Sequence, residues 1–293
     1  MENTVLKIIQ IILLLAVLYI IFQITRAYQK KQASFGDSKK FFTGFLIGFI
    51  TDLLDTWGIG SFATTTTLFK FAHFHDDDKN LPGTMTVGHA IPVIVEAFLF
   101  ITVVKIEMTT LIPMTSAAIL GAFFGTRITK NWNAKLVRGT LGILLIVAAI
   151  IMLLRLILNP GENLAENVHG LSLYWLIGGL FFNCGVGILM TMGLGNYAPE
   201  LVFFSLAGVN PLIALPVMML DAAMIMTTSV GAFIKQKRVY WPGLLGIALG
   251  GILGVFFAAK ILTTINLELF KILTIVIVIY TGVMLILESL KAK

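Results

Sequence analysis

The sequence predicts an all-α integral membrane protein built from two inverted-topology repeats, each a broken-helix hairpin plus three transmembrane helices, with one extra N-terminal helix. Three observations predict this fold class. Of the 293 residues, 58% are apolar and only 12% are charged, whereas a soluble domain has about 25% charged residues. Most of the chain lies in apolar stretches long enough to cross a bilayer. Glycines and prolines also recur at matching positions in the two halves.

The N-terminal apolar run, from Val5 to Ile24, predicts a retained membrane helix rather than a signal peptide. It is longer than the 7–15 apolar residues of a signal peptide, and no small-x-small cleavage site follows it. Six further stretches have the length of a membrane helix. The seven predicted spans are 5–24, 84–104, 108–126, 137–158, 212–233, 241–260 and 268–288.

Two apolar stretches do not fit a single helix. Residues 41–71 and 171–207 are too long for one crossing, and each is interrupted by glycines and polar residues. The interruptions are Trp57–Ser61 and Met192–Asn196. Irregular backbone at membrane depth is tolerated only against protein or a water-filled cavity. We therefore expect two hairpins, each made of two short helices.

The loop charges predict the orientation in the cytoplasmic membrane. Cytoplasmic loops collect Lys and Arg, and these residues gather in 25–40, 127–138, 234–240 and the C-terminal tail. The loop 159–170 has none and carries Glu162 and Glu166. We expect the N-terminus outside and the C-terminus in the cytoplasm, with both hairpins returning to their starting side. Two short, complete crossings per hairpin would give the same loop sides.

The sequence predicts that the two halves are repeats. Gly58 and Gly60 recur 135 residues later as Gly193 and Gly195, and Pro82 and Pro113 recur 129 residues later. The first half begins from a cytoplasmic loop and the second from an outside loop, so the repeats are inverted. The predicted units are 1–40 (N-terminal helix and basic loop), 41–158 (first repeat) and 171–290 (second repeat). Inverted repeats with broken helices are typical of secondary transporters, although an inverted-repeat channel would share the pattern.

The duplicated Gly-x-Gly turn resembles that of the sulfite exporter TauE/SafE family, also called the toluene sulfonate uptake permease family. The resemblance extends over residues 40–290 and rests on Gly58-Ile59-Gly60, Gly193-Leu194-Gly195 and the order of the segments. It implies transport of sulfite, sulfonates or similar small organosulfur anions. The chain departs from the family turn at Ser61 and Asn196, where a further glycine is usual.

The two turns are the predicted substrate site. Each exposes backbone N–H groups at the start of a helix, where the helix dipole favours an anion, and glycine lets a ligand approach the backbone. The alternative is that the glycines merely permit tight packing. The predicted substrate-binding residues are Thr56, Trp57, Gly58, Gly60, Ser61, Thr191, Gly193, Gly195 and Asn196.

Carboxyl groups within apolar segments are candidates for proton coupling. Such residues are costly in lipid and are functional candidates by default, and removal from water favours the neutral, protonated form. The alternative for each of them is a hydrogen-bonded side chain that lies at the membrane interface or faces a pore. The candidates are Asp52, Asp55, Glu96 and Asp221. His89 is interpreted first as a packed or pore-lining side chain and second as a proton relay.

These observations predict a secondary transporter, with a small anionic substrate and the lipid bilayer as partners and with possible proton coupling. The alternatives are a proton- or cation-coupled carrier of another small solute and a passive anion channel. Enzymatic activity is not expected. No cofactor and no metal are expected, since the sequence lacks a phosphate-binding glycine-lysine loop and a well-spaced ligand set. The net charge of +6 lies mainly in loops, so nucleic acid is not an expected partner. The coupling ion, the direction of transport and assembly into a homo-oligomer stay open.

Overall fold

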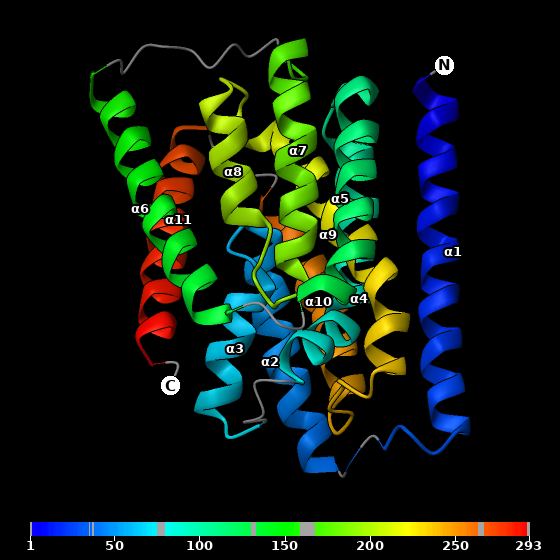
Figure 1. Ribbon diagram of the computed structural model, residues 1–293. Coiled ribbons are helices and arrows are strands. Elements are labelled where there is room, and N and C mark those ends of the chain that lie inside the picture. Colours follow the sequence, from blue (N-terminus) through cyan, green and yellow to red (C-terminus); the bar gives the residue numbers. More distant parts are fainter. Residues whose placement is uncertain are drawn as a thin grey trace.

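The computed structural model describes residues 2–34, 36, 38–74, 80–129, 133–158, 168–262 and 267–291. These described residues form eleven helices and no strand (Figure 1). In chain order the helices are α1 (Glu2–Gln29), α2 (Ser38–Thr56), α3 (Ser61–Phe71), α4 (Leu81–Val103), α5 (Met108–Ile128), α6 (Ala134–Leu158), α7 (Leu173–Met190), α8 (Tyr197–Leu206), α9 (Pro211–Lys235), α10 (Leu244–Leu262) and α11 (Leu267–Lys291).

The predicted all-helical membrane fold is confirmed. Each of the seven predicted spans corresponds to one helix. Within the described part of the chain, six helices are long and apolar enough to cross a bilayer: α1, α4, α5, α7, α9 and α10. The chain is therefore a multi-pass membrane protein. Figure 1 places the N-terminus at one end of the molecule and the C-terminus toward the other.

Both expected hairpins are present, but their two helices are unequal. In the first, α2 has 19 residues and α3 has 11; in the second, α7 has 18 and α8 has 10. A helix of 19 residues is about 28 Å long, so the first helix of each hairpin is nearly a full span and only the second is short. In the first hairpin, α2 gains length because it begins at Ser38, within the basic loop and ahead of the apolar stretch.

Glycine determines where each hairpin breaks. Gly58, Gly60 and Gly193 have φ angles of 86°, 85° and 89°. Glycine adopts this left-handed region without the steric cost that a Cβ atom imposes. The backbone therefore turns between α2 and α3 and between α7 and α8 instead of continuing as a helix.

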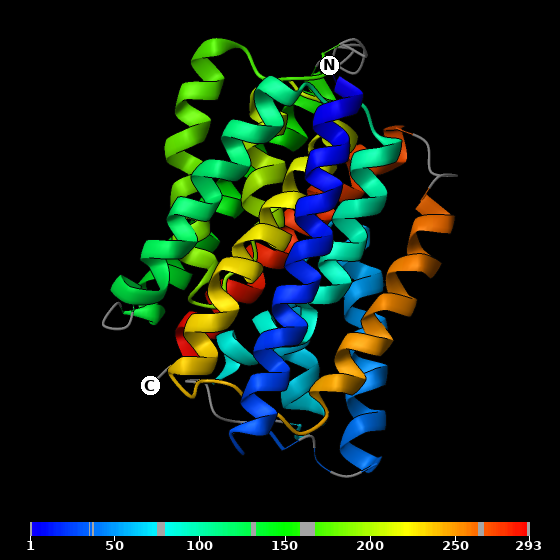
Figure 2. The same ribbon diagram turned by 90° about the vertical axis from the view of Figure 1, so that its right-hand side faces the viewer.

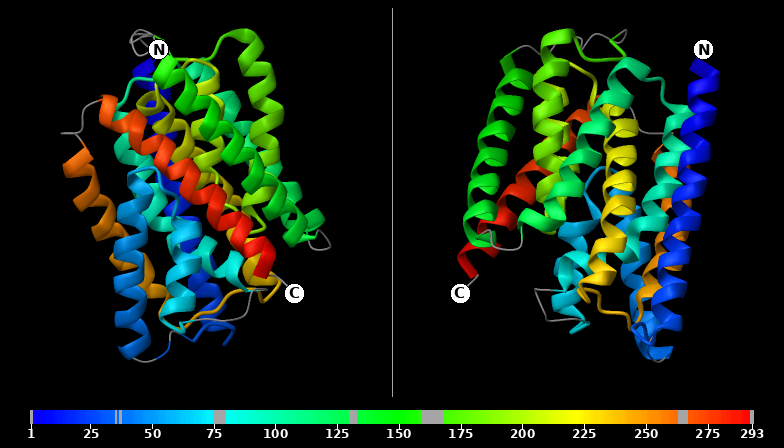
Figure 3. Two further views of the ribbon diagram at one scale, coloured as in Figure 1. Left: turned by 90° about the vertical axis from the view of Figure 1, so that its left-hand side faces the viewer. Right: turned by 45° about the vertical axis from the view of Figure 1, so that its right-hand side comes forward.

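The long helices pack in pairs that join the two halves. Helix α2 packs on α10, α7 on α5, α4 on α9, and α6 on α11. Figure 3 shows α10 beside α2 in its left view and α6 beside α11 in its right view. Small residues bring two of these pairs close together. A Cβ atom on Gly121 of α5 would lie 2.0 Å from the carbonyl oxygen of Cys184, and one on Gly250 of α10 would lie 2.0 Å from that of Phe45. In Figure 1, the α2–α3 hairpin enters from the lower end and the α7–α8 hairpin from the upper end. The inverted relation of the halves and their boundaries stay predictions.

Candidate functional site

The two hairpin turns approach each other in the middle of the molecule (Figure 1). Their contact is reciprocal. A Cβ atom on Gly60 would lie 4.0 Å from Cβ of Tyr197, and one on Gly195 would lie 3.9 Å from Cβ of Phe62. Phe62 and Tyr197 are the second residue after Gly60 and Gly195, respectively. Each turn therefore faces the helix start that follows the other turn.

A small enclosed space separates the turns. Its volume is about 10 Å³, close to the minimum for one water molecule. The turns would therefore have to move apart before an anion of several atoms fits between them. The lining residues are Asp55, Gly60, Ser61, Phe62, Met190, Gly195, Asn196, Tyr197, Ala222 and Met226.

The remaining predicted substrate-binding residues lie around this space without lining it. Gly193 lines a neighbouring cavity of about 20 Å³. The hydroxyls of Thr56 and Thr191 donate to carbonyl oxygens of their own helices, those of Asp52 (2.8 Å) and Ile188 (2.7 Å). Gly58 faces α8, since a Cβ atom there would lie 3.6 Å from Leu201 Cδ1. The indole N–H of Trp57 is buried and has no hydrogen-bond partner among the described residues.

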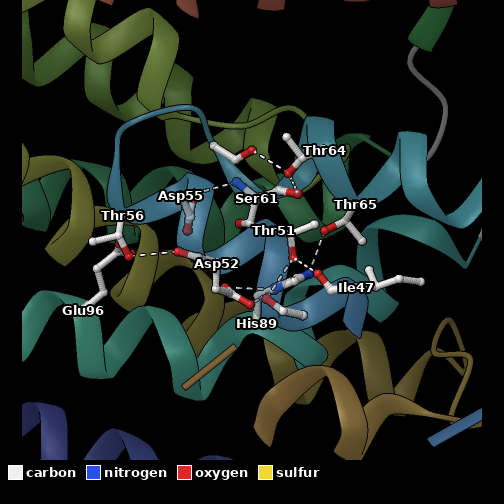
Figure 4. A network of polar contacts seen from close by, with 12 residues as sticks. Ile47, Thr51, Asp52, Asp55, Thr56, Ser61, Thr64, Thr65, His89 and Glu96 are labelled. Atoms are coloured by element: carbon white, nitrogen blue, oxygen red, sulfur yellow. Dashed lines mark hydrogen bonds and ion pairs between the residues drawn. The ribbon is translucent and has the colours of Figure 1, made fainter. Parts of the chain in front are cut away.

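The start of α3 already holds an anionic group. Asp55 Oδ1 accepts a hydrogen bond from the backbone N–H of Ser61 at 2.5 Å (Figure 4). Both residues are buried. A carboxylate at a helix N-terminus satisfies an otherwise unpaired amide and is favoured by the helix dipole. The chain's own Asp55 therefore occupies the position where the sequence predicts an external anion.

The start of α8 lacks an equivalent carboxylate. No side-chain hydrogen bond caps this end within the described part of the chain. The amide of Asn196 instead donates to Glu200 Oε1 at 3.0 Å and to the carbonyl oxygen of Met218 at 2.9 Å. Met190 stands 135 residues after Asp55 and has no charge. The two turns therefore differ. Asp55 accepts from a backbone amide at the start of α3, whereas Glu200, the acid in the first turn of α8, accepts from the side chain of Asn196.

Asp52 forms a buried pair that the sequence analysis did not anticipate. Asp52 Oδ2 lies 2.8 Å from Nδ1 of His89, and His89 Nε2 lies 2.9 Å from Thr65 Oγ1 (Figure 4). Asp52, His89 and Thr65 are all fully buried. The pair joins α2 to α4, and the hydroxyl adds α3. His89 was interpreted first as a packed or pore-lining side chain; it is fully buried, and its hydrogen bonds to α2 and α3 place it at the centre of this cluster.

Glu96 links the first half to the second turn. Tyr197, the first residue of α8, donates its hydroxyl to Glu96 Oε2 at 2.9 Å. Glu96 Oε1 is buried and has no hydrogen-bond partner among the described residues. In Figure 4 the Glu96 side chain lies next to Thr56, at the end of α2. Glu96 is thus placed beside both turns.

The fourth candidate carboxyl group belongs to a separate set of contacts. Asp221 Oδ1 accepts from Thr115 Oγ1 at 2.5 Å, and Asp221 Oδ2 accepts from the side-chain amide of Asn183. These bonds tie α9 to α5 and α7. Glu200, which the sequence analysis did not select, is fully buried as well, and its Oε2 lacks a partner in the described structure. The only signal for Glu200 in the sequence was its place in an apolar hairpin.

Several membrane-spanning helices around two buried, polar helix breaks define a multi-pass membrane protein with the architecture of a solute transporter. Comparison with known proteins supports this class. The model of the family described as "Sulfite exporter TauE/SafE" matches residues 1–152, just over half of the 293-residue chain. The chain belongs to the sulfite exporter TauE/SafE family, which is a family of membrane transporters. No curated protein and no solved structure matches the chain.

Proposed function

We propose that this protein is a secondary transporter that moves a small organosulfur anion, such as sulfite or a sulfonate, across the cytoplasmic membrane. The supporting observation is the reciprocal approach of the two turns, in which Gly60 faces Tyr197 and Gly195 faces Phe62. Broken helices that meet near mid-depth form the substrate site in several transporter folds. Membership of a family of sulfur-anion transporters agrees with this choice of substrate class.

The anion would bind to backbone amides rather than to a basic side chain. Among the described residues, neither Lys nor Arg lines the space between the turns. The start of α8 offers N–H groups without a side-chain cap, and a helix N-terminus carries about half a positive elementary charge. Such an end binds sulfate-like and carboxylate groups readily. The indole N–H of Trp57 is a further donor without a partner in the described structure.

A proton is the expected companion of the anion. The Ser61 amide becomes available only when Asp55 leaves it, and a protonated Asp55 has no charge to hold it at the helix dipole. Protonation of Asp55 and binding of the anion would therefore favour each other, which makes the transporter a proton–anion symporter. The symport also limits the net charge that enters the membrane interior, since a proton neutralises one negative charge.

The groups around Asp55 bear on the same proton. Its own helix contributes Asp52, α4 contributes His89 and Glu96, and α8 contributes Tyr197. His89 and Asp52 neutralise each other as a pair when both are ionised. Glu96 adds a second acid within electrostatic range, so an ionised Asp55 is repelled by its surroundings as well as attracted by the amide. This balance suits a group that has to gain and lose a proton during transport.

Transport of a sulfonate into proteoliposomes tests the proposal, because a sulfonate keeps its charge over the physiological pH range. We expect accumulation of an alkyl sulfonate against its gradient when the outside is acidified. The Asp55→Asn protein should exchange sulfonate for sulfonate, with no accumulation driven by pH. Glu107→Gln is the matched control, because Glu107 is exposed at the start of α5. If Asp55→Asn still accumulates sulfonate in response to pH, Asp55 is not the coupling group.

A cation- or proton-coupled carrier of another solute is the second candidate. The observation that favours it is the excess of buried acids over bases near the turns. Asp52, Asp55, Glu96, Glu200 and Asp221 are all buried, and His89 is the one buried basic side chain among the residues that the structure describes. Binding of cations or neutral solutes, together with no binding of sulfite, thiosulfate or sulfonates, would favour this candidate. Passive equilibration without accumulation would indicate a channel.

A further inference from the structure

Two adjoining cavities lie away from the turns, at the end of the molecule where α1, α5 and α9 finish. One lies between α1 and α9 and has a volume of about 480 Å³; the other lies between α5 and α9 and has a volume of about 430 Å³. They share Ala232 and Lys235 of α9. Volumes of this size are in the range of small-molecule binding sites. Figure 2 shows α1 crossing in front of α9 on this side of the molecule.

The cavities are lined by positive charge. Arg26 and Lys30 come from α1 or its end, Lys235 from α9 and Arg127 from α5. Among the described residues, no acidic side chain lines either cavity. Within the described part of the chain, no ion pair includes any of these four residues. Arg127 lies 4.3 Å from the ring of Phe123, a contact that leaves its N–H donors free for a ligand. The polar lining is completed by donors such as Gln23 and Gln32.

On α1 and α5, exposed apolar side chains lie next to the basic residues that line the cavities. On α1, Leu18 and Phe22 are 62% and 57% exposed, and on α5, Leu120 and Phe123 are 56% and 44% exposed. These residues lie about one to two turns before the cations on the same helices. In a membrane protein, such side chains face lipid tails. A ligand that fills both surfaces has a negative head and an apolar tail.

We propose that these cavities form a binding site for the phosphate headgroup of an anionic phospholipid. Arg and Lys side chains suit phosphate oxygens, and basic pockets between membrane helices bind anionic lipid headgroups. The lipid would connect α1 to the rest of the bundle. Helix α1 packs mainly on α4 and α9, and it meets α9 closely at Gly231, where a Cβ atom would lie 2.6 Å from the hydroxyl of Tyr19. The headgroup site continues this contact toward the helix ends, since Gly231 and Tyr19 also line the larger cavity.

The site differs from a general attraction of basic loops for the membrane. Lys39 and Lys70 are exposed at the start of α2 and the end of α3, and they line neither cavity. A general attraction depends on the number of positive charges. Binding at a specific site depends instead on whether the residues that line the site keep their charges. Removing Arg26 and Lys235 therefore has a different consequence from removing Lys39 and Lys70, although the change in net charge is equal.

The test uses the full-length protein in mild detergent, with phosphatidylglycerol or phosphatidylcholine added back. We expect native mass spectrometry to show retained phosphatidylglycerol and thermal unfolding to shift to higher temperature, with neither effect from phosphatidylcholine. The double variant Arg26→Gln/Lys235→Gln should lose at least tenfold in retention, whereas Lys39→Gln/Lys70→Gln should keep it. The unfolding temperatures of both variants in phosphatidylcholine serve as the folding control.

Two results would overturn the lipid site. Equal loss of retention in the two double variants would mean a general charge effect. The same stabilisation by inorganic phosphate or glycerol phosphate would mean that the cavities bind a free phosphate group and that the apolar surface plays no part. Because transport is not measured, both results are independent of the function proposed for the turns.

Discussion

The hydroxyl of Tyr197 donates a hydrogen bond to Glu96 Oε2 at 2.9 Å, and both side chains are buried. Tyr197 is the first residue after the second turn, and Glu96 belongs to α4 in the first half of the chain. The bond therefore crosses between the two halves at the level of the turns. A movement of the second turn away from α4 would lengthen or break it.

Replacement of Tyr197 by Phe should destabilise the protein. Glu96 Oε1 already lacks a partner among the described residues, so Tyr197→Phe leaves the whole carboxyl group unpaired. A buried polar group without a partner costs about 1–3 kcal/mol, which thermal unfolding in detergent will detect. Tyr174→Phe is the control, because Tyr174 is 87% exposed. An unchanged unfolding temperature for Tyr197→Phe would mean that the bond contributes little.

The sequence was a good guide to the helices because their signals are local. Apolar stretches of about 20 residues predict spans, and the glycines at 58, 60 and 193 adopt the positive φ angles that break a helix. The lengths of the hairpin helices were harder to predict. Helix α2 begins with Ser38 and the lysines that follow it, outside the apolar stretch. A prediction based only on the number of consecutive apolar residues leaves such polar helix residues out.

The polar contacts of the site were not predictable in the same way. Asp52 and His89 are 37 residues apart on different helices, and no periodicity connects them. Their pairing depends on how α2 and α4 pack. The Asp55–Ser61 bond spans six residues, and a carboxylate just before a Gly-x-Gly turn was a signal that an internal cap was available. Because the turn was interpreted as a site for an external anion, Asp55 was not predicted to accept a hydrogen bond from the amide of Ser61.

Breaking the Asp52–His89 pair should be costly. Both side chains are fully buried, and removal of one partner of a buried ion pair costs about 3–5 kcal/mol. We expect Asp52→Asn and His89→Gln each to reduce the free energy of unfolding by about 3 kcal/mol, and the double variant to lose clearly less than the sum. Strict additivity of the two losses would show that the residues do not interact.

The pair between Arg138 and Glu288 is the control for that cycle. Its atoms lie 3.7 Å apart, and its side chains are partly exposed. Such pairs contribute about 0–1 kcal/mol. Glu288→Gln should therefore leave the unfolding midpoint nearly unchanged. A loss as large as that of Asp52→Asn would mean that the measurement reports general charge loss rather than a specific buried pair.

The orientation of the chain is open to a direct measurement. The distribution of Lys and Arg predicts an outside N-terminus and a cytoplasmic C-terminus. Reporter fusions at Lys130, Glu162 and Lys237 should report inside, outside and inside; of these, Lys130 and Glu162 lie outside the described residues. A cytoplasmic signal at Glu162 would contradict the inverted relation between the two halves and, with it, the approach of the hairpins from opposite sides of the membrane.

The sharpest test of the anion site is a single added methyl group at Gly195. Its φ angle lies outside the left-handed region, and the nearest atom to an added Cβ is Phe62 Cβ at 3.9 Å. Alanine therefore fits without a clash, whereas a side chain at Gly60, with φ of 85°, strains the backbone. The methyl group would fill much of the space of about 10 Å³ between the turns. It would also keep an anion from the amides at the start of α8.

We therefore expect Gly195→Ala to unfold at nearly the wild-type temperature and to bind a sulfonate at least tenfold more weakly, a loss of about 1.4 kcal/mol. Gly185→Ala is the matched control, since no atom lies within 4 Å of an added Cβ there. It should leave the sulfonate affinity unchanged and, because it lies inside α7, should unfold at the same or a slightly higher temperature. Gly121→Ala should show the opposite pattern. Its Cβ would lie 2.0 Å from the carbonyl oxygen of Cys184, and overpacking of this kind costs about 1–3 kcal/mol of stability. Wild-type sulfonate affinity in a correctly folded Gly195→Ala protein would refute the site between the turns, because the amides would then be reached from another direction or not used.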